Sequence, residues 1–353
     1  MNREWKQYLQ PLGAVLSSDG ETIEHFGQPE LEHTALISGN VMMPITGRTC
    51  IHASGDDAKS FLQGQLTNDI GLLTQQQSQL SGYCNPKGRL LALFRISQHE
   101  AGYRLHLPEP LLDKTLKRLK MFVLMAKVKL EASPPEVVRI GVVGAQALEK
   151  LSAYFTALPE DENGVIEAGG VTLLRHPGKH PRFELIAEVG AMQKLWEKLL
   201  SEFTPVGSGA WTLLDIDAGQ PQVVSETVEM FIPQMLNLHV INGVSFKKGC
   251  YPGQEVVARL HYRGKLKRHM HIAQFSAEQR PLPGAPLYPV DAGKEAQSVG
   301  NIVLAQPATE GLFHALCVIA NEHAVDNSLS LQQGKKALFK LHDLPYNFPA
   351  VSE

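Results

Sequence analysis

Hydrophobic residues recur with two different spacings along the first third of the chain. Residues 49–55 are typical of a strand that ends in a turn, and residues 56–66 carry apolar side chains at helical spacing. Residues 80–97 predict a β-hairpin whose turn is Asn85-Pro-Lys-Gly88. Residues 111–125 predict a helix with one apolar and one basic face. The apolar positions of the two helices are Ala58, Phe61, Leu62 and Leu66, then Leu112, Leu116, Leu119 and Val123.

A second unit follows the breaker Ser133-Pro-Pro and ends at the Gly/Ser run of residues 206–209. Its pattern predicts a strand, a helix, two strands and a second helix, which is close to a split β–α–β unit. The expected ranges are 137–143, 145–157, 171–175, 183–187 and 191–203, in that order.

The remaining segments complete the expected architecture. A helix is predicted over residues 211–218, and beyond residue 271 short apolar runs alternate with Gly, Pro and Asp turns, which favours a small β-barrel. Weak periodicity in residues 1–40 suggests an N-terminal extension. The sequence therefore predicts an α+β protein of three subdomains preceded by that extension. We expect a core of residues 41–132 plus 206–270, a split β–α–β (ferredoxin-like) subdomain at 133–205 and a C-terminal β-barrel at 271–353.

Composition favours a cytoplasmic protein. The 353 residues are 43% hydrophobic and 20% charged, with no apolar run long enough to span a membrane and no apolar signal segment near Met1, so no membrane partner is expected. The four cysteines, far apart and without a CxxC pair, do not predict disulfides or structural zinc. No metal is expected, because no histidine pair has convincing ligand spacing; His176 and His180, for example, are separated by Pro177-Gly178.

The net charge is −3, but two segments are strongly basic. Residues 114–129 contain six Lys or Arg and no acid, and residues 247–270 contain seven against Glu255 alone. Such segments suit a phosphate or carboxylate ligand or the backbone of tRNA, and solvated surface faces would give the same pattern.

One cysteine lies in a chemically suggestive setting. In Lys248-Gly-Cys-Tyr-Pro-Gly-Gln-Glu255, Pro252 suits a first helical turn, which would place Cys250 just before a helix. The positive end of that helix and the adjacent lysines would favour a thiolate, whereas Cys50, Cys84 and Cys317 lie in apolar strand patterns. Cys250 is therefore a candidate nucleophilic, redox or metal-ligating thiol, with a buried structural cysteine as the alternative.

Several motifs, in order along the chain, carry a wider resemblance. They are Phe61-Leu-Gln-Gly-Gln-Leu-Thr-Asn-Asp69, Cys84-Asn-Pro-Lys-Gly88, Trp211 to Pro221, Phe231-Ile-Pro-Gln, Asn237-Leu, Gly243 to Arg259 and Tyr262-Arg-Gly264. Together they resemble the YgfZ proteins, bacterial relatives of the folate-dependent aminomethyltransferase (T-protein) of glycine cleavage. The matches run from about residue 45 to 270.

The resemblance implies a cloverleaf-like fold whose central hole takes tetrahydrofolate or another reduced folate. It implies a role in iron–sulfur cluster assembly or repair, iron–sulfur client enzymes that include tRNA-thiolating ones, and at most transient contact with a cluster. The family's essential cysteine matches Cys250. Its folate-associated tryptophan matches Trp211, for which stacking on the ligand is favoured and ordinary core packing is the alternative. A second folate-associated aromatic falls near Arg48, a departure from the family. We expect Arg48, Arg259 and Arg263 to hold folate carboxylates or a partner, and the motif loop to be shaped by Lys248, Gly249, Tyr251, Gly253, Gln254 and Glu255.

An absence bears on catalysis. The resemblance implies that aminomethyl transfer needs an acidic residue on the strand after the hairpin turn, but residues 90–94 contain none. A non-catalytic assembly factor is therefore favoured over a true aminomethyltransferase. The alternatives are a one-carbon transferase or demethylase that uses Asp215, Asp217 or Glu226, and a tRNA-binding module that uses the basic segments.

Overall fold

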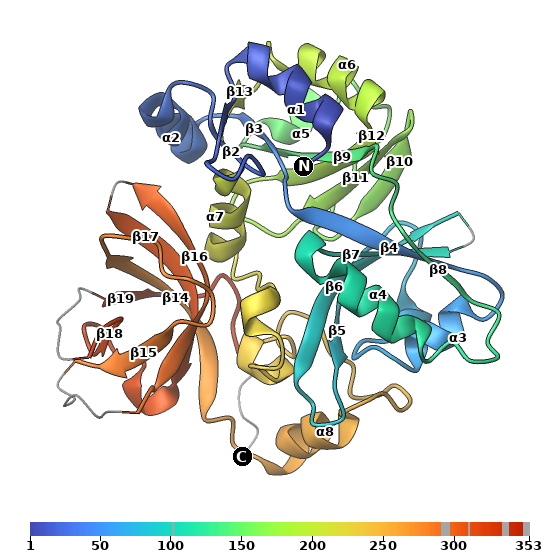
Figure 1. Cartoon of the computed structure of the whole chain (residues 1–353), viewed down its shortest axis with the longest axis vertical. Helices are drawn as coiled ribbons and strands as arrows, with labels where there is room; N and C mark the ends of the chain where they lie inside the picture. Colours follow the sequence, from blue (N-terminus) through green and yellow to red (C-terminus); the bar gives the residue numbers. More distant parts are fainter. Residues whose placement is uncertain (101, 291–296, 310, 334–338, 349–353) are drawn as a thin grey trace.

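Three lobes, each built on its own β-sheet, meet around a central helix, α7 (Gly209–Asp217) (Figure 1). The computed structural model describes residues 1–100, 102–290, 297–309, 311–333 and 339–348. The predicted C-terminal unit, 271–353, therefore lies partly outside the described residues. Sheets and helices alternate irregularly along the chain, so the α+β class is confirmed.

The first lobe is a five-stranded antiparallel sheet in the order β5-β6-β7-β4-β8. The predicted hairpin is confirmed as β5 and β6, but both predicted helices are shorter than expected. Gly64 follows α3 directly, and α4 gives way to turns at residue 121. The elements are β4 (Arg48–Ser54), α3 (Ala58–Gln63), η2 (Ile70–Leu72), β5 (Gln79–Cys84), β6 (Leu90–His99), β7 (Gly102–Pro108), η3 (Glu109–Leu111), α4 (Leu112–Lys120) and β8 (Lys129–Ala132).

The second lobe is a six-stranded sheet in the order β10-β11-β12-β9-β3-β13. Strand β12 lies between β9 and β11 and is antiparallel to both, which confirms the split β–α–β arrangement. The sheet also contains three strands that the pattern did not predict, namely β10, β3 and β13. The elements are β3 (Val41–Pro44), β9 (Val137–Val143), α5 (Ala147–Leu151), β10 (Val165–Ala168), β11 (Val171–His176), β12 (Arg182–Glu188), α6 (Val189–Leu199) and β13 (Thr204–Pro205).

The N-terminal residues pack into this second lobe instead of forming a separate extension. Trp5 and Leu9 are buried, and the Trp5 ring meets Trp196 of α6 edge to face, with 5.5 Å between ring centroids. Strand β3 also departs from the expected division, because the sequence pattern assigns residues 41–44 to the core, after the boundary at residue 40. Instead, β3 pairs with β9 of the second lobe. Weak periodicity hid this, because two large side chains four positions apart suffice to anchor a short helix. The elements are α1 (Arg3–Leu9), η1 (Gln10–Leu12), β1 (Val15–Leu16), β2 (Ile23–His25) and α2 (Pro29–Ser38).

The third lobe is a curled six-stranded sheet, a half-barrel in the order β18-β15-β16-β17-β14-β19. One face carries its own core around Phe275, Phe313 and Phe339, and Met270 and Leu316 on the opposite face belong to the same hydrophobic core as the apolar residues of the first lobe. The elements are β14 (Arg268–Ser276), β15 (Pro286–Pro289), β16 (Gly300–Thr309), β17 (Leu312–Ala320), η6 (Asn321–His323), β18 (Leu329–Ser330) and β19 (Phe339–His342).

A long connection carries the chain from α7 to β14. It contains η4 (Ser225–Thr227), η5 (Pro233–Leu236) and α8 (Gln254–Arg263). Its buried residues, among them Phe231, Leu238 and Val257, belong to the core of the first lobe. The connection thus fixes both the helix at the centre of the molecule and the segment that contains Cys250.

Candidate functional site

Helix α8 begins at Gln254, two residues later than the sequence predicted. Pro252 lies in the preceding turn, and Gly253, with a φ of 82°, occupies the N-cap position. Cys250 is therefore four residues ahead of the helix, on an exposed loop. The expectation that the helix start holds this thiol directly is corrected: its position depends on what anchors the loop.

One anchor is a glycine-to-glycine contact with the predicted hairpin turn. A Cβ atom on Gly253 would lie 2.5 Å from the carbonyl oxygen of Asn85 and 2.6 Å from Cα of Gly88. Gly88 also has a positive φ, 72°, and the Asn85 side chain accepts hydrogen bonds from the backbone N–H groups of Lys87 and Arg89. The two turns lie so close that neither glycine leaves room for a side chain.

The second anchor is the ammonium group of Lys248. It is buried and donates to the carbonyl oxygens of Gln63 (2.6 Å), Leu66 (2.5 Å) and Asn68 (3.0 Å), at the end of α3. Burial lowers the pKa of Lys248 to about 8, against the opposing effect of Asp69. Three acceptors use all three donors of the ammonium group, so Lys248 fixes the loop and does not face a ligand.

The other motif residues divide into buried and open positions. The Tyr251 ring is buried beneath the Lys248 ammonium, at 5.3 Å from ring centroid to Nζ, and burial raises the pKa of its hydroxyl, helped by Cys84. Gln254 is half-buried and Glu255 is exposed. Gly249 has open space where a Cβ would lie and no positive φ, so nothing in the described part of the chain explains a glycine there.

Cys250 is the one exposed cysteine of the four. Cys50, Cys84 and Cys317 are buried, which confirms the expectation from their apolar surroundings. Burial raises the pKa of Cys84 to about 12 and that of Cys317 further still. Only the Cys250 thiol is presented to solvent.

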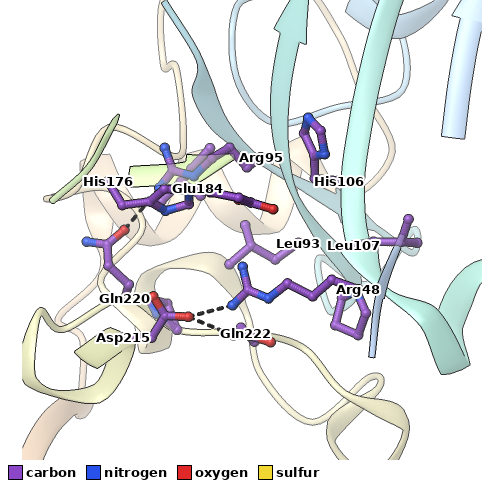
Figure 2. Close-up of a pocket in the computed structure, with 13 residues that line it drawn as sticks. Arg48, Leu93, Arg95, His106, Leu107, His176, Glu184, Asp215, Gln220 and Gln222 are labelled. Atoms are coloured by element: carbon purple, nitrogen blue, oxygen red, sulfur yellow. Dashed lines mark hydrogen bonds and ion pairs between the residues drawn. The ribbon is translucent and has the colours of Figure 1, made fainter. Parts of the chain in front are cut away.

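A second candidate region is a small polar cavity of about 50 Å³ between the lobes (Figure 2). It receives side chains from β4, β6 and β7 of the first lobe, from β11 and β12 of the second, and from α7. Its lining residues include Arg48, Leu93, Arg95, His106, His176, Glu184, Asp215, Gln220 and Gln222.

Asp215 of α7 is held by two arginines. Its Oδ2 lies 2.5 Å from Nη2 of Arg48 and accepts from the amide of Gln222 at 3.0 Å (Figure 2). Its Oδ1 lies 2.9 Å from Nη2 of Arg182. Burial alone would raise the pKa of Asp215, but the charges of Arg48 and Arg182 lower it overall. This carboxylate is therefore ionised and already paired, which suits it poorly to act as a general base.

Glu184 of β12 forms a second buried cluster. Its two carboxylate oxygens lie 2.5 Å from Nη1 of Arg139 and 2.9 Å from Nε2 of His176. Burial opposes ionisation, but Arg139 and His176 hold the pKa of Glu184 well below its usual value. Burial also lowers the pKa of His176, to about 4, and that of His106, so both imidazoles are neutral near pH 7.

Arg95 of β6 is buried without a carboxylate partner. It donates to Asn163 (2.5 Å), Ser78 (3.2 Å) and Gln220 (3.4 Å), and burial lowers its pKa to about 10. With Arg48, Arg139 and Arg182 there are four arginines around two carboxylates, and both Nη1 of Arg182 and the Trp211 indole N–H lack a hydrogen-bond partner among the described residues. Of the four arginines, Arg48 and Arg95 line the cavity, so the surplus positive charge extends beyond its walls.

The structure places the four predicted folate-binding residues in two separate regions. Arg48 lines the cavity, while Trp211 is 2% exposed, has Arg182 over its ring at 5.0 Å and does not line the cavity. Arg259 and Arg263 are exposed on α8 and line a different cleft, of about 370 Å³, beside Glu255. A role for all four in one pocket stays a prediction.

The three rival carboxylates also lie apart. Asp217 pairs with His314 at 2.7 Å, and Glu226 is exposed; neither lines the cavity. The strand after the hairpin turn brings Leu93 and Arg95 to the cavity where the transferase resemblance implies an acid.

Sequence reasoning missed the buried charges Arg95, Arg139, Arg182 and Glu184. A signal was present, since Arg139 interrupts the apolar run 137–143 and Arg95 the run 90–96. Charged side chains inside apolar strands are rarely buried unless they are paired. Arg95 and Arg139 within these apolar runs could therefore have predicted a buried cluster of paired charges.

Two absences hold for the described residues. No group of three or more His, Cys, Asp or Glu side chains there could hold a metal ion. None of the described helices is long and apolar enough to cross a membrane.

No protein-family model matches the sequence. Curated relatives do: the tRNA-modifying protein YgfZ of Yersinia enterocolitica is 33% identical over 294 residues, which cover 83% of this chain and 88% of the relative. The proteins of the same name from Yersinia pseudotuberculosis and Yersinia pestis are 34% identical over the same length. The chain belongs to the YgfZ family.

The fold agrees with that membership. The glycine cleavage system aminomethyltransferase T of Bartonella henselae superimposes with a TM-score of 0.74 and covers 96% of both chains, at 19% sequence identity. This confirms the aminomethyltransferase-like fold expected from the YgfZ resemblance. At such low identity the likeness concerns the fold alone.

Proposed function

We propose that this protein is a folate-binding accessory factor in iron–sulfur cluster assembly or repair that affects tRNA modification, with Cys250 as its functional thiol. The observation that carries the proposal is the exposure of Cys250 on a loop held by Lys248 and Gly253. A thiolate is a nucleophile and a soft metal ligand, so an exposed thiol at a fixed position suits transient contact with a cluster or a client thiol. The YgfZ membership supports the link to tRNA modification.

The charge of the central cavity suits an anionic ligand such as a folate. Folates carry glutamate carboxylates, and an arginine fork binds a carboxylate through paired hydrogen bonds. Arg95 lines the cavity and bonds to neutral oxygen acceptors, and beside the cavity Nη1 of Arg182 is buried with no partner among the described residues. The positive charge of these arginines supports an anionic ligand such as reduced folate.

The ligand requires the cavity to widen. Drug-sized ligands occupy pockets of roughly 300–1,000 Å³, against about 50 Å³ here. The Arg48–Asp215 pair lies at this cavity, and Arg48 is the more exposed partner of the pair. We propose that Arg48 exchanges Asp215 for a folate carboxylate as the cavity opens.

Calorimetric titration with tetrahydrofolate tests the folate proposal. We expect saturable binding that Arg48→Ala weakens about tenfold or more, because hydrogen bonds to charged groups contribute about 1.5–3 kcal/mol. Arg104→Ala is the matched control, since Arg104 is similarly covered but pairs with Glu167 away from the cavity. No heat of binding, or equal losses in both variants, would overturn the proposal.

The ion pairs of Asp215 with two arginines disfavour a one-carbon transferase, because this carboxylate is not free to act as a general base. Direct tRNA contact through the basic segments remains a further element of the proposal, supported by the charge of residues 114–129 and 247–270. Direct contact predicts that tRNA binding falls steeply with salt concentration and does not require folate.

A further inference from the structure

Four large apolar side chains are exposed together just after α4. They are Met121, Phe122, Leu124 and Met125, and the last two are 87% and 97% exposed. We call this segment, residues 121–125, the α4 tip. Single exposed apolar residues are common, but a contiguous group of this kind usually marks an interaction site.

The packing of α4 does not account for the α4 tip. Leu116, Leu119 and Val123 already supply the apolar face that packs on the first lobe. Leu124 has a φ of 43°, a left-handed backbone that is unfavourable for a bulky side chain. The fold therefore gains nothing evident from presenting these residues to solvent.

Positive charge surrounds the α4 tip. Among the described residues, Lys114, Lys117 and Lys120 take part in no ion pair. Lys127 and Lys129 pair only with the exposed Asp56 and Glu131, and exposed pairs of this kind contribute little. The surface therefore complements a partner that is acidic at its rim and apolar at its centre.

The α4 tip and the Cys250 loop attach to opposite ends of one short helix. The backbone N–H of Lys127 donates to Asp57, just before α3, and Lys248 binds the carbonyl oxygens of Gln63 and Leu66 at its far end. Helix α3 has six residues and is thus about 9 Å long. Figure 1 shows the end of α4 beside α3 and the loop before α8 on the same side of the molecule. A standard interface, about 800 Å² per partner, is wide enough to cover both.

We propose that the α4 tip is a docking surface for an acidic protein whose reacting group it brings to Cys250. This rests on the proposed role of Cys250, because the docked protein is the client of that thiol. Methionine-rich apolar surfaces are typical of adaptable protein contacts. Single-stranded RNA stacks on aromatic rings, whereas three of the four tip side chains are aliphatic and Arg118 lies over the ring of Phe122.

Photo-crosslinking in living cells tests the docking surface. The photoreactive residue p-benzoylphenylalanine replaces Met125 in one variant and the exposed Lys247, close to Cys250, in another. We expect both positions to capture the same acidic protein. Lys117→Glu with Lys120→Glu should lower the yield at position 125 about tenfold or more, because the reversed charges at the rim would repel an acidic partner. Lys194→Glu with Lys198→Glu, exposed on α6, should leave it unchanged.

The outcomes separate docking from the role of Cys250. No adduct, an adduct with RNA, lipid or a second copy of this chain, or different proteins at the two positions would overturn docking. A crosslinking yield at position 125 that does not change with Lys117→Glu and Lys120→Glu would also overturn docking. Crosslinking does not need the thiol, so capture that persists in Cys250→Ser, together with normal tRNA modification in that variant, would keep the docking surface and reject the proposed function.

Discussion

Buried cations appear in two parts of this chain, and their partners differ. At the Cys250 loop, Lys248 gives all three of its donors to backbone carbonyl oxygens. In and beside the central cavity, four arginines surround two carboxylates, and Nη1 of Arg182 has no partner among the described residues. The first arrangement fixes the backbone that presents a thiol, and the proposed folate binding depends on the uncompensated positive charge of the second. A buried cation whose donors are all satisfied thus has a structural role.

The largest stability effect should come from the cavity. Glu184→Ala leaves Arg139 buried without its carboxylate, which costs about 3–5 kcal/mol in unfolding free energy. Urea unfolding measures this, with Glu167→Ala as control because its pair with Arg104 is more exposed and should cost about 1 kcal/mol or less. Equal losses for the two variants would contradict the buried pairing.

Lys248→Met tests the anchor of the Cys250 loop. It leaves three carbonyl oxygens without their charged donor, and we expect a loss of roughly 2–4 kcal/mol. The neighbouring Lys247 is exposed, so Lys247→Met should change stability by no more than about 0.5 kcal/mol. If both variants unfold at the same urea concentration, the ammonium group does not hold the loop.

As pH falls, the folded protein should lose stability through the buried cavity histidine before the cavity carboxylates are protonated. The pKa of His176 is about 4 in the folded protein, because burial disfavours the charged imidazole. Unfolded chains bind the proton near pH 6.5, so stability is lost as pH falls from about 6.5 towards 4. For His176 alone this is roughly 2 kcal/mol between pH 6.5 and 5. Unfolding measured at both pH values should show a smaller fall in His176→Gln; an identical fall would remove His176 from the account.

Gly253→Ala should give the smallest of these losses, about 1–3 kcal/mol, because alanine cannot easily adopt a φ of 82° and its Cβ would meet Asn85. Gly249→Ala is the matched control, with open space at its Cβ position and no positive φ. Thermal unfolding distinguishes them. A Gly249 variant that melts normally but lowers tRNA modification would show that this glycine serves a partner.

The sequence predicted most elements because apolar spacing records which face of each element is buried. The hairpin over residues 80–97 and the split β–α–β unit follow from such local patterns. The attachment of Trp5 to Trp196 and of Lys248 to the carbonyl oxygens after α3 joins segments that lie far apart in the chain. Neither contact leaves a local pattern. The cavity is still harder to predict from the sequence, because Arg95, Glu184 and Asp215 meet only after three elements have packed.

The central claim concerns Cys250, and one measurement tests it most directly. Thiolated nucleosides are quantified in tRNA from a deletion strain that carries Cys250→Ser at the wild-type protein level. Cys50→Ser is the control, since serine can keep the contact of Cys50 with His52, 3.4 Å from Sγ to Nε2. We predict nucleoside levels near those of the deletion strain for Cys250→Ser and near wild type for the control, with both proteins folded. Wild-type levels in Cys250→Ser would contradict the account.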